Sequence, residues 1–245
     1  MRQNRKTPPV VPPPSPDGRG NRGGRPRLTN DPAAILGRVE QKKRRFDRTR
    51  ASDPSHLPDD YYARFTFASF RLEGIEITEQ VVREALGHGR QRPVLRTRLG
   101  QRLRSHAAIL RHIEIDLRRG VPLETDRVVR WYTAVSAGLS TTSLDRASSS
   151  RLEEIVRLIN ALPPRVQAAL REVVSVHARL VAEPLVPGFN GILARLLLRF
   201  HLGRWGFPAV LFDTFLDGQR LKPDSLSRRL LHLVEQRYDA LLSPD

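Results

Sequence analysis

Apolar residues recur along most of this chain at the spacing of a helix. Between residues 99 and 119 they fall every three or four positions, which places them on one helical face. The same spacing predicts long helices over residues 163–183, 192–205 and 224–242. Long periodic segments of this kind predict an all-α fold.

Start and stop signals delimit further helices. An aromatic-rich helix over residues 61–74 is predicted to end at Gly74, because glycine adopts the left-handed conformation found after a helix C-terminus. Thr78 is predicted to cap the next helix, since its hydroxyl can accept a hydrogen bond from a free N–H of the first turn. Asp126 is the candidate cap of a helix over residues 128–139.

The pattern changes after residue 139. Residues 140–150 are rich in Ser and Thr and predict a loop. Residues 151–160 alternate weakly between apolar and polar positions, which favours a short hairpin or an extended flap. We therefore expect a small β-hairpin near residues 145–160 in an otherwise helical fold.

The first part of the chain is predicted to be a leader. Residues 1–32 are dominated by Pro and Gly and contain no aromatic residue, so they cannot bury enough apolar surface to offset the entropy of ordering. Residues 33–50 form a candidate basic helix with Asp31 as its N-cap. We therefore expect a disordered leader over residues 1–56 and a folded domain over residues 57–245.

Charge is concentrated at the same end. The chain has 42 basic and 26 acidic residues, a net charge of +16, of which residues 1–50 carry +10 (14 basic, 4 acidic). Such an arm favours nonspecific contact with nucleic acid through residues 1–50, or a solvated leader without a partner. The ten arginines between residues 83 and 119 lack the interleaved aromatic side chains that stack on bases, so they are better explained as a solvated helix face.

Composition excludes several classes of site. The chain has no cysteine, hence no disulfide framework, thiol nucleophile or cysteine metal site. No histidine stands near paired carboxylates at the spacing of metal ligands, and we expect no metal site. No apolar run approaches the roughly 20 residues that span a bilayer, and the N-terminus lacks the apolar core of a secretory signal. We expect a cytoplasmic protein without a membrane partner; its oligomeric state is left open.

Residues 177–208 contain the main candidate site. The pattern there is a helix, a short loop rich in Pro, Gly and Asn, and a second helix that carries Arg195 one turn from its start. A loop that opens onto a helix N-terminus favours phosphate, because the free N–H groups and the helix dipole both attract anions.

This stretch resembles the signature of the Fic (Fido) family, within a helix-loop-helix over residues 163–205. Members carry a helix with an internal His, then His-Pro-Phe-x-Asp/Glu-Gly-Asn-Gly-Arg-x-x-Arg, and later Gly-aromatic-Pro. The matching residues align without a gap and are His177, Asn190, Gly191, Arg195 and Gly206-Phe207-Pro208. The resemblance implies a helical fold, ATP as cofactor, and phosphate binding by Asn190, Gly191 and Arg195.

A second motif lies about a hundred residues upstream. Ser69, Glu73 and Gly74 match the inhibitory motif of the family, Ser/Thr-x-x-x-Glu-Gly/Asn. In the family this Glu enters the nucleotide site and pairs with the last Arg of the signature. The resemblance therefore implies an inhibitory or regulatory contact between Glu73 and Arg195.

The departures from the signature concern the residues that perform the chemistry. In the family, the His takes a proton from a target hydroxyl, which attacks the α-phosphate of ATP, and the carboxylate holds Mg²⁺. Here the His falls on Pro184 and the carboxylate on Gly188. The first loop Gly falls on Phe189 and the first Arg on Ile192. Loss of a general base typically costs roughly 10²–10⁴-fold in rate, and Mg²⁺ loses its ligand.

Three functions remain open, so the sequence does not decide whether the chain is an enzyme. The first is a degenerate Fic-like protein that has lost AMP transfer to protein hydroxyls, wholly or largely, and serves as a binding or regulatory module. Its partner would add a strand at the 145–160 flap. The second is an active nucleotidyl- or phosphoryl-transferase with Glu183 as base, which requires a one-residue slip in the loop. The third is a nucleic-acid-associated protein that uses residues 1–50 and the arginine-rich face of residues 83–119.

Overall fold

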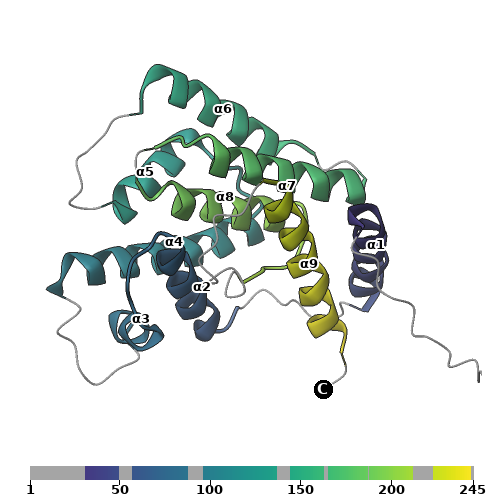
Figure 1. The fold of residues 1–245 in the computed structure, drawn as a ribbon, viewed down its shortest axis with the longest axis horizontal. Coiled ribbons are helices and arrows are strands. Elements are labelled where there is room, and N and C mark those ends of the chain that lie inside the picture. The colour runs from purple at the N-terminus through teal and green to yellow at the C-terminus, as the bar shows by residue number, and fades with distance from the viewer. Residues whose placement is uncertain are drawn as a thin grey trace, which may run out of the picture.

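Helices make up the whole regular structure of the part of the chain that this computed structural model describes, and no strand occurs in it. Figure 1 shows them as a layered bundle with α8 in its interior. The all-α fold is confirmed for these residues. They are residues 31–49, 57–87, 96–136, 144–162, 165–186, 188–211 and 223–243.

The helices follow one another along the chain with short connections between most of them. Their bounds are α1 Pro32–Thr49, α2 Asp59–Leu72, α3 Glu79–Ala85, α4 Arg98–Arg118, α5 Thr125–Val135, α6 Arg146–Asn160, α7 Val166–Ala182, α8 Asn190–Arg204 and α9 Pro223–Leu242. The central helix is α8, which packs against α2, α4, α5, α6 and α7. Its residues 192–202 are all buried, as expected for a helix that is surrounded on every side.

Of the signals predicted for α2, α3 and α5, those of α2 and α3 are confirmed and that of α5 is wrong. The Thr78 side chain accepts a hydrogen bond from the Val81 N–H (3.3 Å) and so caps α3. Gly74 follows the end of α2 with a φ of +78°, in the left-handed region. Asp126, however, lies inside the first turn of α5, because the extended residue before that helix is Glu124. Its carboxylate still favours the positive end of the helix dipole.

The hairpin predicted near residues 145–160 is wrong, because this segment forms helix α6. Its buried side chains are spaced by three or four positions, which is the helical pattern. The weak alternation of apolar and polar residues in the sequence therefore did not indicate a strand. The buried apolar side chains are Leu152, Ile155, Val156 and Ile159. This face packs against α5 and α8, so the segment does not present the free strand that peptide capture by strand addition requires.

The domain boundary predicted at residue 57 is also wrong, because helix α1 belongs to the domain. The predicted N-cap is confirmed: the Asp31 carboxylate accepts a hydrogen bond from the Ala33 N–H (3.2 Å). Ile35 and Val39 are fully buried where α1 meets α7 and α9. The rest of the predicted leader, residues 1–30 and 50–56, lies outside the described residues.

Ion pairs explain why so basic a helix docks on the domain. Arg38 donates to Glu235 of α9 at 2.6 Å, and Lys42 lies 3.1 Å from the same carboxylate. Burial raises the pKa of Glu235, but hydrogen bonds from Arg38 and Lys42 outweigh it and leave the pKa below its ordinary value. The acid that binds Arg38 and Lys42 therefore comes from the far end of the chain, where sequence periodicity does not reveal it.

Candidate functional site

Arg195 and Glu73, which the two motifs single out, are in contact. The Arg195 Nη2 atom donates a hydrogen bond to Glu73 Oε1 at 2.8 Å. The two side chains are 9% and 19% exposed, so the pair is largely removed from water. Burial lowers the pKa of the Arg195 guanidinium, while the charge of Glu73 and its hydrogen bond act to raise it.

Arg195 has a second acceptor on the same helix. Its Nη2 atom also donates to the main-chain carbonyl of Ser69 at 2.7 Å. At the end of α2 the Glu73 N–H turns back to the Phe70 carbonyl, three residues earlier, which leaves the Ser69 carbonyl available. A guanidinium there satisfies a carbonyl of the last turn and lies at the negative end of the helix dipole. Arg195 thus holds the end of α2 by two contacts.

Gly191 makes room for this arrangement. A Cβ atom at position 191 would lie 2.1 Å from Glu73 Oε1 and 3.0 Å from Arg195 Nη1. The Glu73 carboxylate therefore rests against the first turn of α8, where free N–H groups and the helix dipole favour an anion. It occupies the place where the resemblance puts a phosphate.

The loop before α8 has an unusual backbone. Gly188 has a φ of +65°, and Phe189, the N-cap of α8, has a φ of +51°. A bulky residue in the left-handed region is strained and persists only where its surroundings hold it. The Phe189 ring lies 6.3 Å from the Phe70 ring and under the Arg102 guanidinium at 5.2 Å. An aromatic ring thus stands at the start of the helix, where the family has a small residue.

The Asn190 side chain is used within the protein. Its Oδ1 atom accepts a hydrogen bond from the Leu185 N–H at 2.9 Å, and its Nδ2 atom donates to the Leu180 carbonyl at 2.7 Å. These two bonds tie the loop to the end of α7. Both ends of the amide are therefore engaged with the main chain, a structural role that the sequence did not reveal.

The Glu183 side chain forms its ion pair with α6 and not with Arg195. Its side chain is 57% exposed and forms an ion pair with Arg151 of α6 at 3.3 Å. Arg151 also donates to the carbonyl of Pro184 at 3.0 Å. The Glu183 N–H also donates to the Arg179 carbonyl of α7 at 2.8 Å, and none of the contacts described for Glu183 joins it to Arg195.

Buried polar groups lie near the pair, and one of them, His106, was not singled out from the sequence as a site residue. His106 of α4 shares a hydrogen bond of 2.9 Å with Thr66 of α2, and burial lowers its pKa to about 3. The sequence signal was available, because His106 lies on the apolar face of its helix. Three buried atoms near the pair have no partner among the described residues, and they are Ser69 Oγ, His106 Nε2 and Arg195 Nε.

His177, the internal histidine of the signature helix, is also buried. Burial and the nearby charge of Arg195 lower its pKa to about 3, while a hydrogen bond with the main chain of Ala194 opposes them. A neutral histidine between α7 and α8 fits a structural role. It agrees with the sequence interpretation that His177 does not replace the missing base.

A second buried ion pair lies one turn further along α8. Arg199 donates to Glu114 of α4 at 2.6 Å, and the two side chains are 7% and 10% exposed. The sequence signal for Arg199 is its position four residues after Arg195 in a helix that is otherwise mostly apolar. It joins α4 to α8 as Arg195 joins α2 to α8.

The described residues contain no group of three or more His, Asp or Glu side chains that could hold a metal ion. At the position of the family's metal ligand, Gly188 offers no side-chain donor. Within the same described ranges, no helix is long and apolar enough to cross a membrane.

Comparison with known proteins supports the fold. The structure is similar to the crystal structure of a Fic domain containing signaling protein from Bacteroides thetaiotaomicron, with a TM-score of 0.58 and 15% sequence identity. The match covers 82% of this chain and 94% of that one. No protein-family model and no curated protein matches the sequence. The chain therefore has a Fic-like fold.

Proposed function

We propose that this protein is a degenerate Fic-like protein in which AMP transfer is lost or strongly reduced, and that it acts as a binding or regulatory module. The observation that carries the proposal is the closed start of α8. There the Glu73 carboxylate rests on Gly191, and Arg195 is engaged by Glu73 and by the Ser69 carbonyl.

The residues that stand at the reactive positions support the loss of chemistry. Pro184 has no side-chain group that takes up a proton, and its carbonyl already accepts a hydrogen bond from Arg151. Gly188 cannot hold a metal ion on the phosphates. Without a base the rate falls by roughly 10²–10⁴-fold, and the loss of metal-borne charge neutralisation adds to this.

Nucleotide binding is the activity of the Fic signature for which this site keeps Gly191 and Arg195. ATP would supply the phosphates, and Arg195 with the first turn of α8 would bind them. For this, Arg195 must give up its two present acceptors. Removal of Glu73 takes away only one of them, so we expect a Glu73→Gly variant to gain ATP affinity only in part.

The test is ATP binding and AMP transfer with the full chain. Wild type, Glu73→Gly and Arg195→Ala are incubated with labelled ATP and Mg²⁺ or Mn²⁺, with Arg204→Ala as a control on the same helix. We expect no AMP incorporation by any variant, and weak ATP binding that Glu73→Gly strengthens and Arg195→Ala abolishes.

If the Glu73→Gly variant incorporates labelled AMP in the presence of metal, the proposal that AMP transfer is lost would be wrong. A Glu73→Gly, Glu183→Gln double variant then shows whether Glu183 is the base, because labelling disappears only if it is. If the wild type and the Arg195→Ala variant bind ATP equally well, Arg195 does not bind the phosphates and the proposed nucleotide site is wrong.

A further inference from the structure

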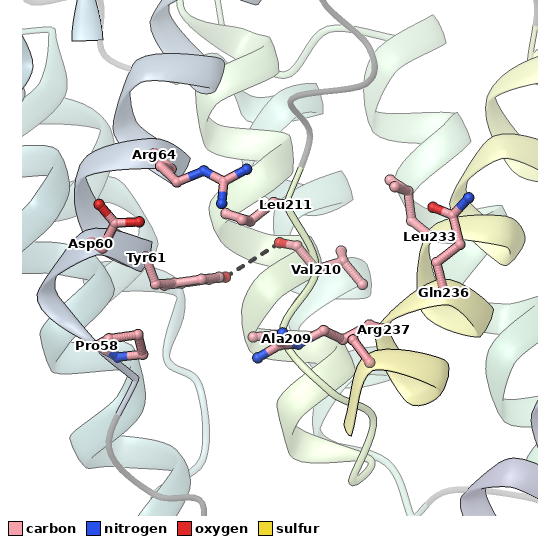
Figure 2. Close-up of a pocket in the computed structure, with 11 residues that line it drawn as sticks. Pro58, Asp60, Tyr61, Arg64, Ala209, Val210, Leu211, Leu233, Gln236 and Arg237 are labelled. Atoms are coloured by element: carbon pink, nitrogen blue, oxygen red, sulfur yellow. Dashed lines mark hydrogen bonds between the residues drawn. The ribbon is translucent and has the colours of Figure 1, made fainter. Parts of the chain in front are cut away.

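A cavity separate from the start of α8 lies between three parts of the fold. Its volume is about 290 Å³, and it is bounded by the beginning of α2, residues 209–211 and α9 (Figure 2). Most of its wall is apolar and consists of Pro58, Tyr61, Val210, Leu211, Leu233 and Ala240. For scale, a cavity of about 150 Å³ accommodates benzene in another protein.

The inner wall is held in place by a hydrogen bond. The Tyr61 hydroxyl donates to the Val210 carbonyl at 3.3 Å, and Tyr61 and Val210 are 5% and 2% exposed. This bond joins α2 to the segment that follows α8, as the dashed line in Figure 2 shows. The cavity therefore has a fixed apolar floor.

Two arginines give the cavity its charge. Figure 2 shows the guanidinium of Arg64 directed toward Leu211 and that of Arg237 directed toward Ala209, both beside the apolar wall. The acidic lining residue, Asp60, is already paired with Arg83 of α3. Arg237 forms no ion pair with a carboxylate of the described residues. The lining is thus mostly apolar, and Arg237 supplies a cationic group that no described carboxylate neutralises.

The geometry points to a binding site for a small molecule with an apolar body and one carboxylate. The apolar part lies against Tyr61, Leu211 and Leu233, and the carboxylate accepts hydrogen bonds from Arg237. A guanidinium suits this task because its planar donors match a carboxylate. The cavity volume, about twice that of a benzene cavity, corresponds to a ring with a short acidic chain.

This inference does not rest on the proposed function. Tyr61 and Glu73 lie at opposite ends of α2, about 18 Å apart along the helix at 1.5 Å per residue. A ligand in the cavity therefore leaves Arg195 and its acceptors untouched. Failure of ATP binding and failure of ligand binding here are separate results.

The probe is 4-phenylbutyrate, compared with its neutral analogue 4-phenyl-1-butanol in a ligand-observed NMR titration of the full chain. A ligand of this size is expected to bind with a Kd on the order of 1 mM. Because charge-assisted hydrogen bonds carry the selectivity, the alcohol should bind about tenfold more weakly.

Variants locate the site. Arg237→Gln should weaken 4-phenylbutyrate about tenfold. Arg228→Gln, the same change at an exposed position of α9, should leave the Kd unchanged. Ala240→Leu should weaken both ligands, because it fills the cavity without altering charge. Circular dichroism of each variant confirms that the fold is kept.

Three results would overturn the inference. One is the absence of saturable binding at about twenty times the expected Kd. Another is that the wild type binds 4-phenylbutyrate and 4-phenyl-1-butanol with equal affinity, or that the Arg237→Gln and Arg228→Gln variants bind 4-phenylbutyrate equally well. The third is a crystal structure in which side chains of the protein itself fill the cavity.

Discussion

At the scale of single residues, the site depends on how closely Glu73 approaches the main chain of α8. Gly191 lacks a Cβ atom, and the Glu73 carboxylate occupies the space where that atom would be. The motifs in the sequence singled out Glu73, Gly191 and Arg195. The distances from position 191 to Glu73 and Arg195 show in addition that Gly191 leaves room for the contact between these two side chains.

We therefore predict that Gly191→Ala destabilises the protein by about 1–3 kcal/mol, because the new methyl displaces the carboxylate and leaves Arg195 short of a partner. In a Glu73→Ala background the same change should be neutral or stabilising, since Ala favours a helix over Gly. Urea unfolding of the four proteins measures the coupling. Gly37→Ala in α1, where the methyl meets nothing within 4 Å, is the control and should not destabilise. An equal cost of Gly191→Ala in both backgrounds would contradict the prediction.

At the scale of elements, α6 and α1 are the two that sequence analysis misjudged. In α6 the buried residues 155 and 156 are adjacent in sequence, which a strand with one buried face does not allow. The apolar stripe was present in the sequence, but it is short. In α1 the charge suggested a leader, because the acid that pairs with Arg38 and Lys42 lies almost two hundred residues away.

The helical assignment of α6 predicts the effect of core truncations. Ile155→Ala should cost about 2–5 kcal/mol, and Val156→Ala should cost somewhat less but clearly more than zero, because both side chains are buried. Glu153→Ala, at an exposed position of the same helix, should leave the urea midpoint nearly unchanged. A hairpin would bury only one of the two neighbours, so a loss confined to one of them would contradict the helix.

At the scale of the whole molecule, three histidines of the described residues are buried in the core. Burial lowers the pKa of His106 and His177 to about 3 and that of His201 to about 4, against an ordinary value of 6.5. The folded protein therefore keeps them neutral in mildly acidic solution, while the unfolded chain takes up protons below pH 6.5. The carboxylates with lowered pKa values change the free energy of unfolding mainly at more acidic pH, below about 4.5, where the unfolded chain takes up protons on them.

We predict that the free energy of unfolding falls as the pH decreases from 6.5 to 5, with a slope that approaches about 1.4 kcal/mol per pH unit for each buried histidine. Urea unfolding at several pH values measures this slope. His201→Phe keeps the aromatic contact with Trp205, whose ring lies 4.3 Å away, but removes one titrating group. The slope for the His201→Phe variant should be smaller by about 1.4 kcal/mol per pH unit, which corresponds to one proton. An unchanged slope would show that His201 is not buried in neutral form.

The sequence by itself determined the helical class, most helix ends and the two motifs, and the resemblance implied which residues of the signature are missing. Each of these depends on residues that are close together in the chain, whose spacing and capping chemistry act locally. The resemblance implied the contact between Glu73 and Arg195, but the tertiary structure decided that Arg195 also meets the Ser69 carbonyl, that the Asn190 amide is engaged by the main chain, and that α1 joins the domain. The Ser69 contact and the docking of α1 depend on packing between groups that are far apart in sequence, 126 residues for Ser69 and Arg195, and no local pattern encodes such distances.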